Sequence, residues 1–82
     1  MIEEKNYTER DLEASLRRAF VEGKADFIPF DGHTARNGFL RDGINYGQER
    51  GWLDEGKEIN EEQWTTIEYR LTEKGKKYFG LN

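Results

Sequence analysis

The strongest constraint on the fold is a short run of alternating side chains in the second half of the chain. In TTIEYRL, residues 65–71, apolar Ile67, Tyr69 and Leu71 alternate with polar residues. Successive side chains of a strand point to opposite faces, so this period of two predicts a half-buried β-strand. The chain must therefore contain a sheet with one covered face.

A different periodicity occupies the N-terminal part of the chain. Apolar residues recur every three or four positions from Leu12 to Phe20, as on the buried side of a helix. Thr8 precedes this run as a capping residue, and Gly23 follows it as a stop signal. A helix over residues 8–22 is predicted.

A second helix is predicted from Thr34, another capping residue, to Arg50, with Gly51 ending it. At 100° per residue, the glycines at 43, 47 and 51 fall on the same side as the apolar residues. We therefore expect glycine to let a neighbouring element approach this helix closely. The segment between the helices, residues 25–32, contains Pro29, which limits it to an edge strand or an extended connector.

The C-terminal third is expected to form a hairpin followed by a helix. A short strand at Trp52 and Leu53 would pair with residues 65–71 through an acidic connection over residues 54–62. Thr72 can then cap a last helix from Glu73 to Phe79.

These elements predict one α+β domain over residues 1–82, with two main helices, a hairpin and a short C-terminal helix. Only 34% of the residues are hydrophobic, so the core is small and dimerisation would add to it; a homodimer is among the expected states. The absence of cysteine excludes disulfides and thiolate metal sites.

Charge and composition also exclude several functional classes. The net charge of −4 gives no overall basic field for nucleic acid, so any such binding requires a local patch. Neither a signal peptide nor a membrane-length apolar run is present, which predicts a cytoplasmic protein without membrane contact. Asp31 and His33 lack further ligands at metal-binding spacing, and no catalytic or cofactor motif stands out, so neither an enzyme nor a cofactor is expected.

Two short motifs in the second half carry a family resemblance. ERGWL, residues 49–53, joins the second helix to the hairpin, and YRLTEKG, residues 69–75, joins the hairpin to the last helix. With their spacing they cover residues 34–82, which resembles the winged-helix domain of small bacterial, archaeal and phage regulators. The resemblance implies that the second helix enters the major groove of DNA and that the hairpin is the wing.

On this hypothesis, the outward side chains of the second helix read the DNA, since arginine matches guanine edges and asparagine or glutamine matches adenine. Lysines of the last helix would contact phosphates. The predicted nucleic-acid contacts are Arg36, Arg41, Asn45, Gln48, Lys74 and Lys77.

An alternative is a winged-helix scaffold that binds another protein and not DNA. Phosphates repel an acidic wing, whereas a basic partner would be attracted to it. Trp64 adds an aromatic side chain on the polar face of its strand, where a partner would shield it from water. The predicted protein contacts are Glu58, Glu61, Glu62 and Trp64.

Overall fold

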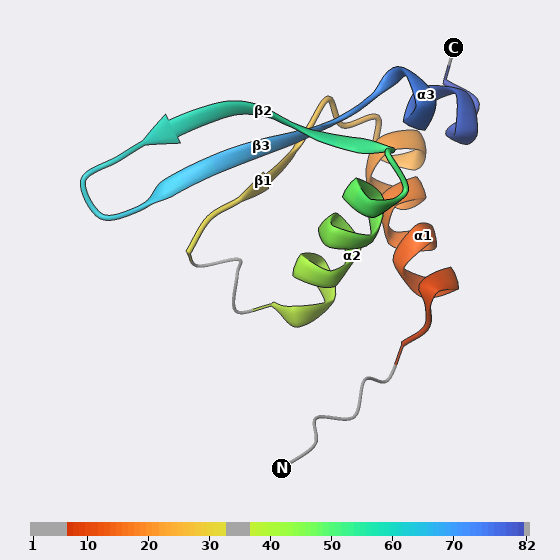
Figure 1. Cartoon of the computed structure of the whole chain (residues 1–82), viewed down its shortest axis with the longest axis horizontal. Coiled ribbons are helices and arrows are strands. Elements are labelled where there is room, and N and C mark those ends of the chain that lie inside the picture. The colour runs from red at the N-terminus through yellow and green to blue at the C-terminus, as the bar shows by residue number, and fades with distance from the viewer. Residues whose placement is uncertain (1–6, 33–36, 82) are drawn as a thin grey trace.

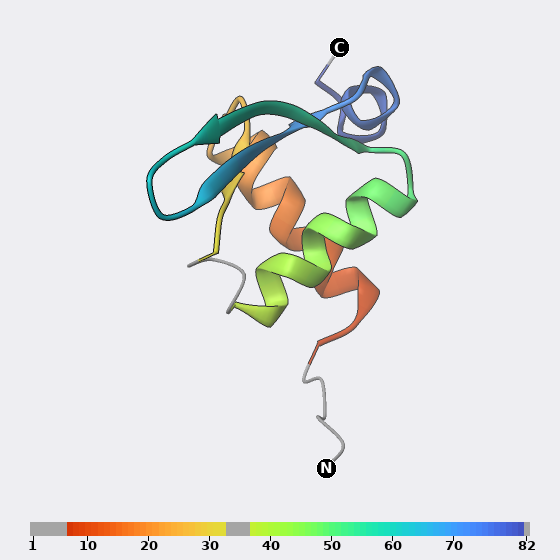
Figure 2. The same cartoon turned by 60° about the vertical axis from the view of Figure 1, so that its left-hand side comes forward.

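The computed structural model describes residues 7–32 and 37–81, which form three α-helices and a three-stranded antiparallel sheet. The elements are α1 (Glu9–Arg17), the π-helical turn η1 (Arg18–Glu22), β1 (Ile28–Phe30), α2 (Gly38–Glu49), β2 (Leu53–Asn60), β3 (Thr65–Leu71) and α3 (Glu73–Phe79). Helices α1 and α2 cross beneath the sheet, and α3 lies at the end opposite the hairpin turn (Figures 1 and 2). The predicted α+β class, with two main helices, a hairpin and a short C-terminal helix, is confirmed.

The first helix starts and ends near the predicted positions, but its end is unusual. Thr8 Oγ1 accepts from the Asp11 amide and Asp11 Oδ2 accepts from the Thr8 amide, a reciprocal capping box. The last five residues form the wider π-helical turn η1. Gly23, the predicted stop, keeps a right-handed conformation with φ −81°, and Lys24 adopts the left-handed one with φ 53°.

Helix α2 begins later than predicted. Asn37 Oδ1 accepts from the Leu40 amide at 3.2 Å, so Asn37 is the capping residue and the predicted start at Thr34 is wrong. Thr34 itself lies outside the described residues. The predicted end is confirmed, because Gly51 has φ 79°, the left-handed conformation that favours glycine.

The glycines of α2 face the core, as predicted. Gly43 and Gly47 are buried, and a Cβ atom on Gly47 would lie only 2.6 Å from Leu53 Cδ1 and 3.2 Å from Leu16 Cδ1. Only a residue without a side chain allows α1 and β2 to approach α2 this closely.

The sheet has the order β1-β3-β2, with β3 in the centre. The segment with Pro29 forms the edge strand β1, where a residue without an amide hydrogen is tolerated. Tyr69 faces the core and is buried, which confirms the predicted covered face of β3. Glu68 was expected to face water on the other side, but it is also buried and forms an ion pair with Arg70 at 3.2 Å.

The hairpin is longer than predicted. Strand β2 runs from Leu53 to Asn60, so most of the predicted acidic connection is strand, and the turn occupies residues 61–64. The register shifts between Glu55 and Glu58, which inserts a bulge into β2. Charged side chains are common on an edge strand because its outer side is in water, and this is why the acidic run was misassigned.

Helix α3 is held against the turn between α2 and β2. Thr72 Oγ1 accepts from the Gly75 amide at 3.0 Å, and the same hydroxyl donates to the Gly51 carbonyl. Gly75 lies directly on the Trp52 backbone, since a Cβ atom there would be 2.4 Å from the Trp52 carbonyl oxygen. The buried core joins all these elements through Leu16, Phe20, Ile28, Ile44, Trp52, Leu53, Tyr69 and Phe79.

Candidate nucleic-acid interface

The outward side of α2 presents one line of polar side chains. Arg41, Asn45 and Gln48 are spaced by four and three residues, so they share one side of the helix, and all three are exposed. We call these three residues the α2 face. Burial of Gly43 and Gly47 on the other side fixes the orientation of the helix and keeps the α2 face in solvent.

Arg41 is oriented by contacts near the start of α2. Its side chain is 51% exposed, and its Nε lies 4.0 Å from Asp42 Oδ1. Asp42 in turn accepts a hydrogen bond from the Tyr7 hydroxyl, and the Tyr7 ring packs edge-on against Phe39. The planar guanidinium therefore has a carboxylate beside its Nε and still presents donors to solvent.

One flank of the α2 face is acidic. A shallow groove between the start of α1 and the outer side of α2 is lined by the carboxylates of Glu9, Asp42 and Glu49 beside Asn45. These charges oppose a phosphate on this flank. A carboxylate can accept from the exocyclic amine of cytosine, however, so the acidic flank fits contact with base edges better than contact with the DNA backbone.

Among the other predicted nucleic-acid contacts, Lys74 lies beside the end of α2. The aliphatic part of its side chain covers Gly51, where a Cβ atom would meet Lys74 Cδ at 3.4 Å and Nζ at 3.5 Å. Lys77 is exposed on α3. Arg41 lies ten residues before Gly51, or about 15 Å along a helix, so Arg41 and Lys74 lie near opposite ends of α2. Arg36 lies outside the described residues.

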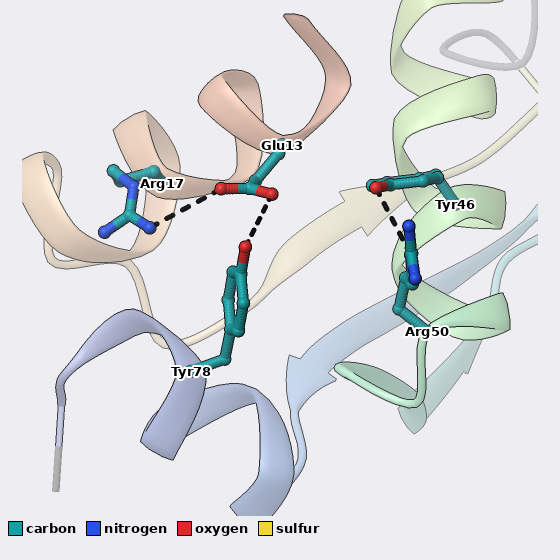
Figure 3. Close-up of polar contacts among 5 residues, drawn as sticks. All are labelled: Glu13, Arg17, Tyr46, Arg50 and Tyr78. Atoms are coloured by element: carbon teal, nitrogen blue, oxygen red, sulfur yellow. Dashed lines mark hydrogen bonds and ion pairs between the residues drawn. The ribbon is translucent and has the colours of Figure 1, made fainter. Parts of the chain in front are cut away.

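The sequence did not predict the polar network where the three helices meet (Figure 3). Glu13 accepts from the Tyr78 hydroxyl at 2.8 Å and pairs with Arg17 at 3.6 Å. Separately, at the end of α2, Arg50 Nε donates to the Tyr46 hydroxyl one turn earlier at 3.2 Å. The spacing of Glu13 and Arg17 is readable in the sequence, whereas Tyr78 reaches Glu13 from 65 residues away.

These contacts shift two ionisation equilibria. The pKa of Tyr78 is raised above its usual value, mainly by the hydrogen bond to Glu13 and to a smaller extent by partial desolvation. The hydrogen bond to Tyr46 raises the pKa of Arg50, which stays charged in any case. Tyr78 also stacks on Trp52 with 4.2 Å between ring centroids, so its contacts fix α3 against α1 and against the turn that follows α2.

The predicted protein contacts lie at the far end of the hairpin. The turn is closed by a 2.9 Å hydrogen bond from the Glu61 amide to the Trp64 carbonyl. A small hollow in this turn is lined by Glu61, Glu62 and Trp64. Trp64 is 42% exposed and belongs to the turn, so its predicted place on a strand was wrong. Glu58 lies further along β2 opposite Ile67. We call Glu58, Glu61, Glu62 and Trp64 the acidic hairpin surface.

Among the residues that the structure describes, no group of three or more His, Cys, Asp or Glu side chains could hold a metal ion. His33, one of the two candidate ligands, lies outside the described residues. In the same part of the chain, no helix has the length and apolar character needed to cross a membrane. No family model matches the chain, and no curated protein or solved structure is significantly similar to it.

Proposed function

We propose that this chain is a small winged-helix regulator that binds duplex DNA with the α2 face. The observation that carries the proposal is the line of Arg41, Asn45 and Gln48, exposed on the helix that directly precedes a β-hairpin. A helix followed by a two-stranded wing is the arrangement by which winged-helix proteins place a helix in the major groove. The bound protein would regulate transcription by blocking or recruiting other proteins at the DNA.

The three side chains suit base reading more than backbone contact. Arg41 can donate two hydrogen bonds to guanine, and the amides of Asn45 and Gln48 can each pair with adenine. Lys74, beside the end of α2, is placed for a phosphate. Because the net charge is −4, the general attraction to DNA is weak and most of the affinity must come from these specific contacts.

Fluorescence anisotropy with a random-sequence duplex at low salt, followed by selection of a preferred sequence, tests the proposal. Replacing Arg41, Asn45 and Gln48 together with alanine should weaken binding to the selected duplex at least about tenfold, since each bidentate base contact contributes about 1–3 kcal/mol. Arg10→Ala, which removes an exposed arginine from α1, is the matched control and should change affinity less than about twofold. Absence of binding by the unaltered protein at low salt would rule the proposal out.

The hairpin supports a second candidate function, a scaffold that binds a basic protein. Strand β2 continues to Asn60, so the two-stranded hairpin projects beyond α2 and carries the acidic hairpin surface away from the helices (Figure 1). A half-exposed tryptophan among glutamates suits a partner that supplies cations and an apolar contact.

Charge reversal separates the two candidates. Glu58→Lys, Glu61→Lys and Glu62→Lys combined should abolish capture of a partner and leave duplex binding by the α2 face in place. Glu22→Lys, an exposed glutamate at the end of η1, serves as the control. Unchanged capture by the triple variant argues against the scaffold.

A further inference from the structure

A further site, in addition to the α2 face and the acidic hairpin surface, lies between the end of η1, β3 and α3. An open pocket of about 560 Å³ is formed there by residues from these three elements and from the turn after η1. Pockets of this size are typical of sites for small organic molecules. The pocket is separate from the α2 face and from the acidic hairpin surface, since it shares no residue with either.

The floor of the pocket is apolar. Phe20, which is buried, lies beside the partly buried Val21 and Leu71. Leu81 adds an apolar rim and is 43% exposed. Its position is fixed by the end of α3, where left-handed Gly80 turns the chain and the Leu81 amide donates to the Lys76 carbonyl at 2.8 Å. Such apolar surface favours a ligand with a hydrocarbon body.

The rim carries the cationic side chains of Lys24, Arg70 and Lys76 and the carboxylate of Asp26. Lys76 Nζ also lies 3.8 Å from Glu73 Oε1. Arg70 is held in place by a 3.2 Å ion pair with Glu68, whose side chain is only 10% exposed, and half of the Arg70 side chain remains accessible. An arginine with one edge held by a carboxylate keeps further N–H donors for a ligand.

Lys24 is placed at the rim at a conformational cost. Lys24 has a φ of 53°, in the left-handed region that glycine adopts without strain. The neighbouring glycine, Gly23, does not take this conformation and stays right-handed. The turn is otherwise well bonded, with the Gly23 amide donating to the Arg18 carbonyl at 2.8 Å and the Ala25 amide to the Ala19 carbonyl at 3.0 Å. A left-handed residue directly after the capping residue is a common way for a helix to end, and here this residue is Lys24.

We propose that this pocket binds a small amphipathic carboxylate, with the hydrocarbon body on the apolar floor and the carboxylate at the cationic rim. Lys24 and Arg70 supply charge-assisted hydrogen bonds to the carboxylate, and Asp26 opposes it. The site is independent of DNA binding, because it uses none of the residues of the α2 face.

The probe is 2-naphthoate, and 2-naphthylmethanol is its uncharged counterpart with the same ring system. Titration of the whole chain by ¹H–¹⁵N NMR should give saturable shifts of the Phe20, Val21 and Leu71 amides with the naphthoate, and much weaker binding of the alcohol. Equal binding of both compounds would overturn the carboxylate assignment. Absence of saturable shifts up to the solubility of 2-naphthoate would overturn the site itself.

Three variants test the rim. Lys24→Asn removes the charge and keeps a residue that tolerates the left-handed conformation, so it should fold and bind 2-naphthoate about three- to tenfold more weakly. Asp26→Asn should bind 2-naphthoate more tightly. Lys57→Asn, which makes the same substitution as Lys24→Asn on the exposed bulge of β2, is the control and should leave the affinity unchanged. If Lys24→Asn does not fold, Lys76→Gln provides the same loss of charge. Unchanged affinity in the variant that folds contradicts the proposal.

Discussion

Gly47 marks the closest approach between α2 and the rest of the core. A methyl group there would lie 2.6 Å from Leu53 Cδ1 and 2.7 Å from Leu53 Cγ, and Leu53 is itself buried in the core. We expect Gly47→Ala to lower the free energy of unfolding by about 1–3 kcal/mol, because overpacking outweighs the gain in helix propensity of ~1 kcal/mol. Urea denaturation measures this loss.

Gly38 in the first turn of α2 provides the matched comparison. A Cβ atom there has its nearest contacts at 3.6 Å from Arg41 Nη2 and 3.9 Å from the Tyr7 hydroxyl, which are ordinary distances. Gly38→Ala should therefore be neutral or stabilise the protein by up to about 1 kcal/mol. A similar loss in both variants would show that helix packing does not explain the buried glycines.

Tyr78 predicts an alkaline loss of stability. Its hydrogen bond to Glu13 raises its pKa in the folded protein above the unfolded value of 10.0, so the protonated form is the one that the fold stabilises. This contribution is fully present below the unfolded pKa and is lost as the pH rises through the folded pKa. Unfolding by urea at about pH 8 and about pH 11 should thus show a larger alkaline loss for the unaltered protein than for Tyr78→Phe. Equal alkaline losses of stability in the two proteins would mean that the hydrogen bond between Tyr78 and Glu13 does not stabilise the fold.

At the scale of the elements, Thr72 connects α3 to the end of α2. Its hydroxyl accepts from the Gly75 amide and donates to the Gly51 carbonyl, and the residue is partly buried. Thr72→Ala should cost about 1–2 kcal/mol, whereas Thr72→Ser, which keeps both hydrogen bonds, should cost less.

Thr8 is the corresponding control in α1. It is exposed, and its hydroxyl accepts from Asp11 at the longer distance of 3.4 Å, so Thr8→Ala should cost no more than about 1 kcal/mol. Thermal unfolding followed by circular dichroism compares the variants. A greater loss at Thr8 than at Thr72 would show that the junction of α3 is not a main source of stability.

The elements that the sequence predicted well are those with a strong periodic signal. The alternation in residues 65–71 and the apolar spacing from Leu12 to Phe20 both depend on burial, which the order of residues records directly. The length of β2 was missed because an edge strand does not need apolar residues on both sides. The left-handed Lys24 was missed because neighbouring Gly23 is the better local signal for a helix end.

The candidate sites were less predictable than the elements. The α2 face followed from helical spacing alone, so its exposure was predicted correctly. The contact between Tyr78 and Glu13 depends on how α3 packs on α1, and the pocket at Lys24 depends on how η1, β3 and α3 pack together. Such contacts arise between residues far apart in the chain, and no local pattern indicates them.

At the scale of the whole molecule, the proposed DNA-binding surface, the acidic hairpin surface and the pocket consist of different residues. None of the described residues assigned to one of them belongs to another. Variants at separate surfaces should therefore have independent effects, as expected for distant sites without shared partners.

Whether the α2 face contacts duplex DNA is tested by NMR mapping of the whole chain with a selected duplex. We expect the largest shifts and line broadening at Arg41, Asn45 and Gln48, with Lys74 affected at the end of the helix. Shifts confined to the acidic hairpin surface, or the absence of any shift at low salt, would contradict contact between the α2 face and DNA.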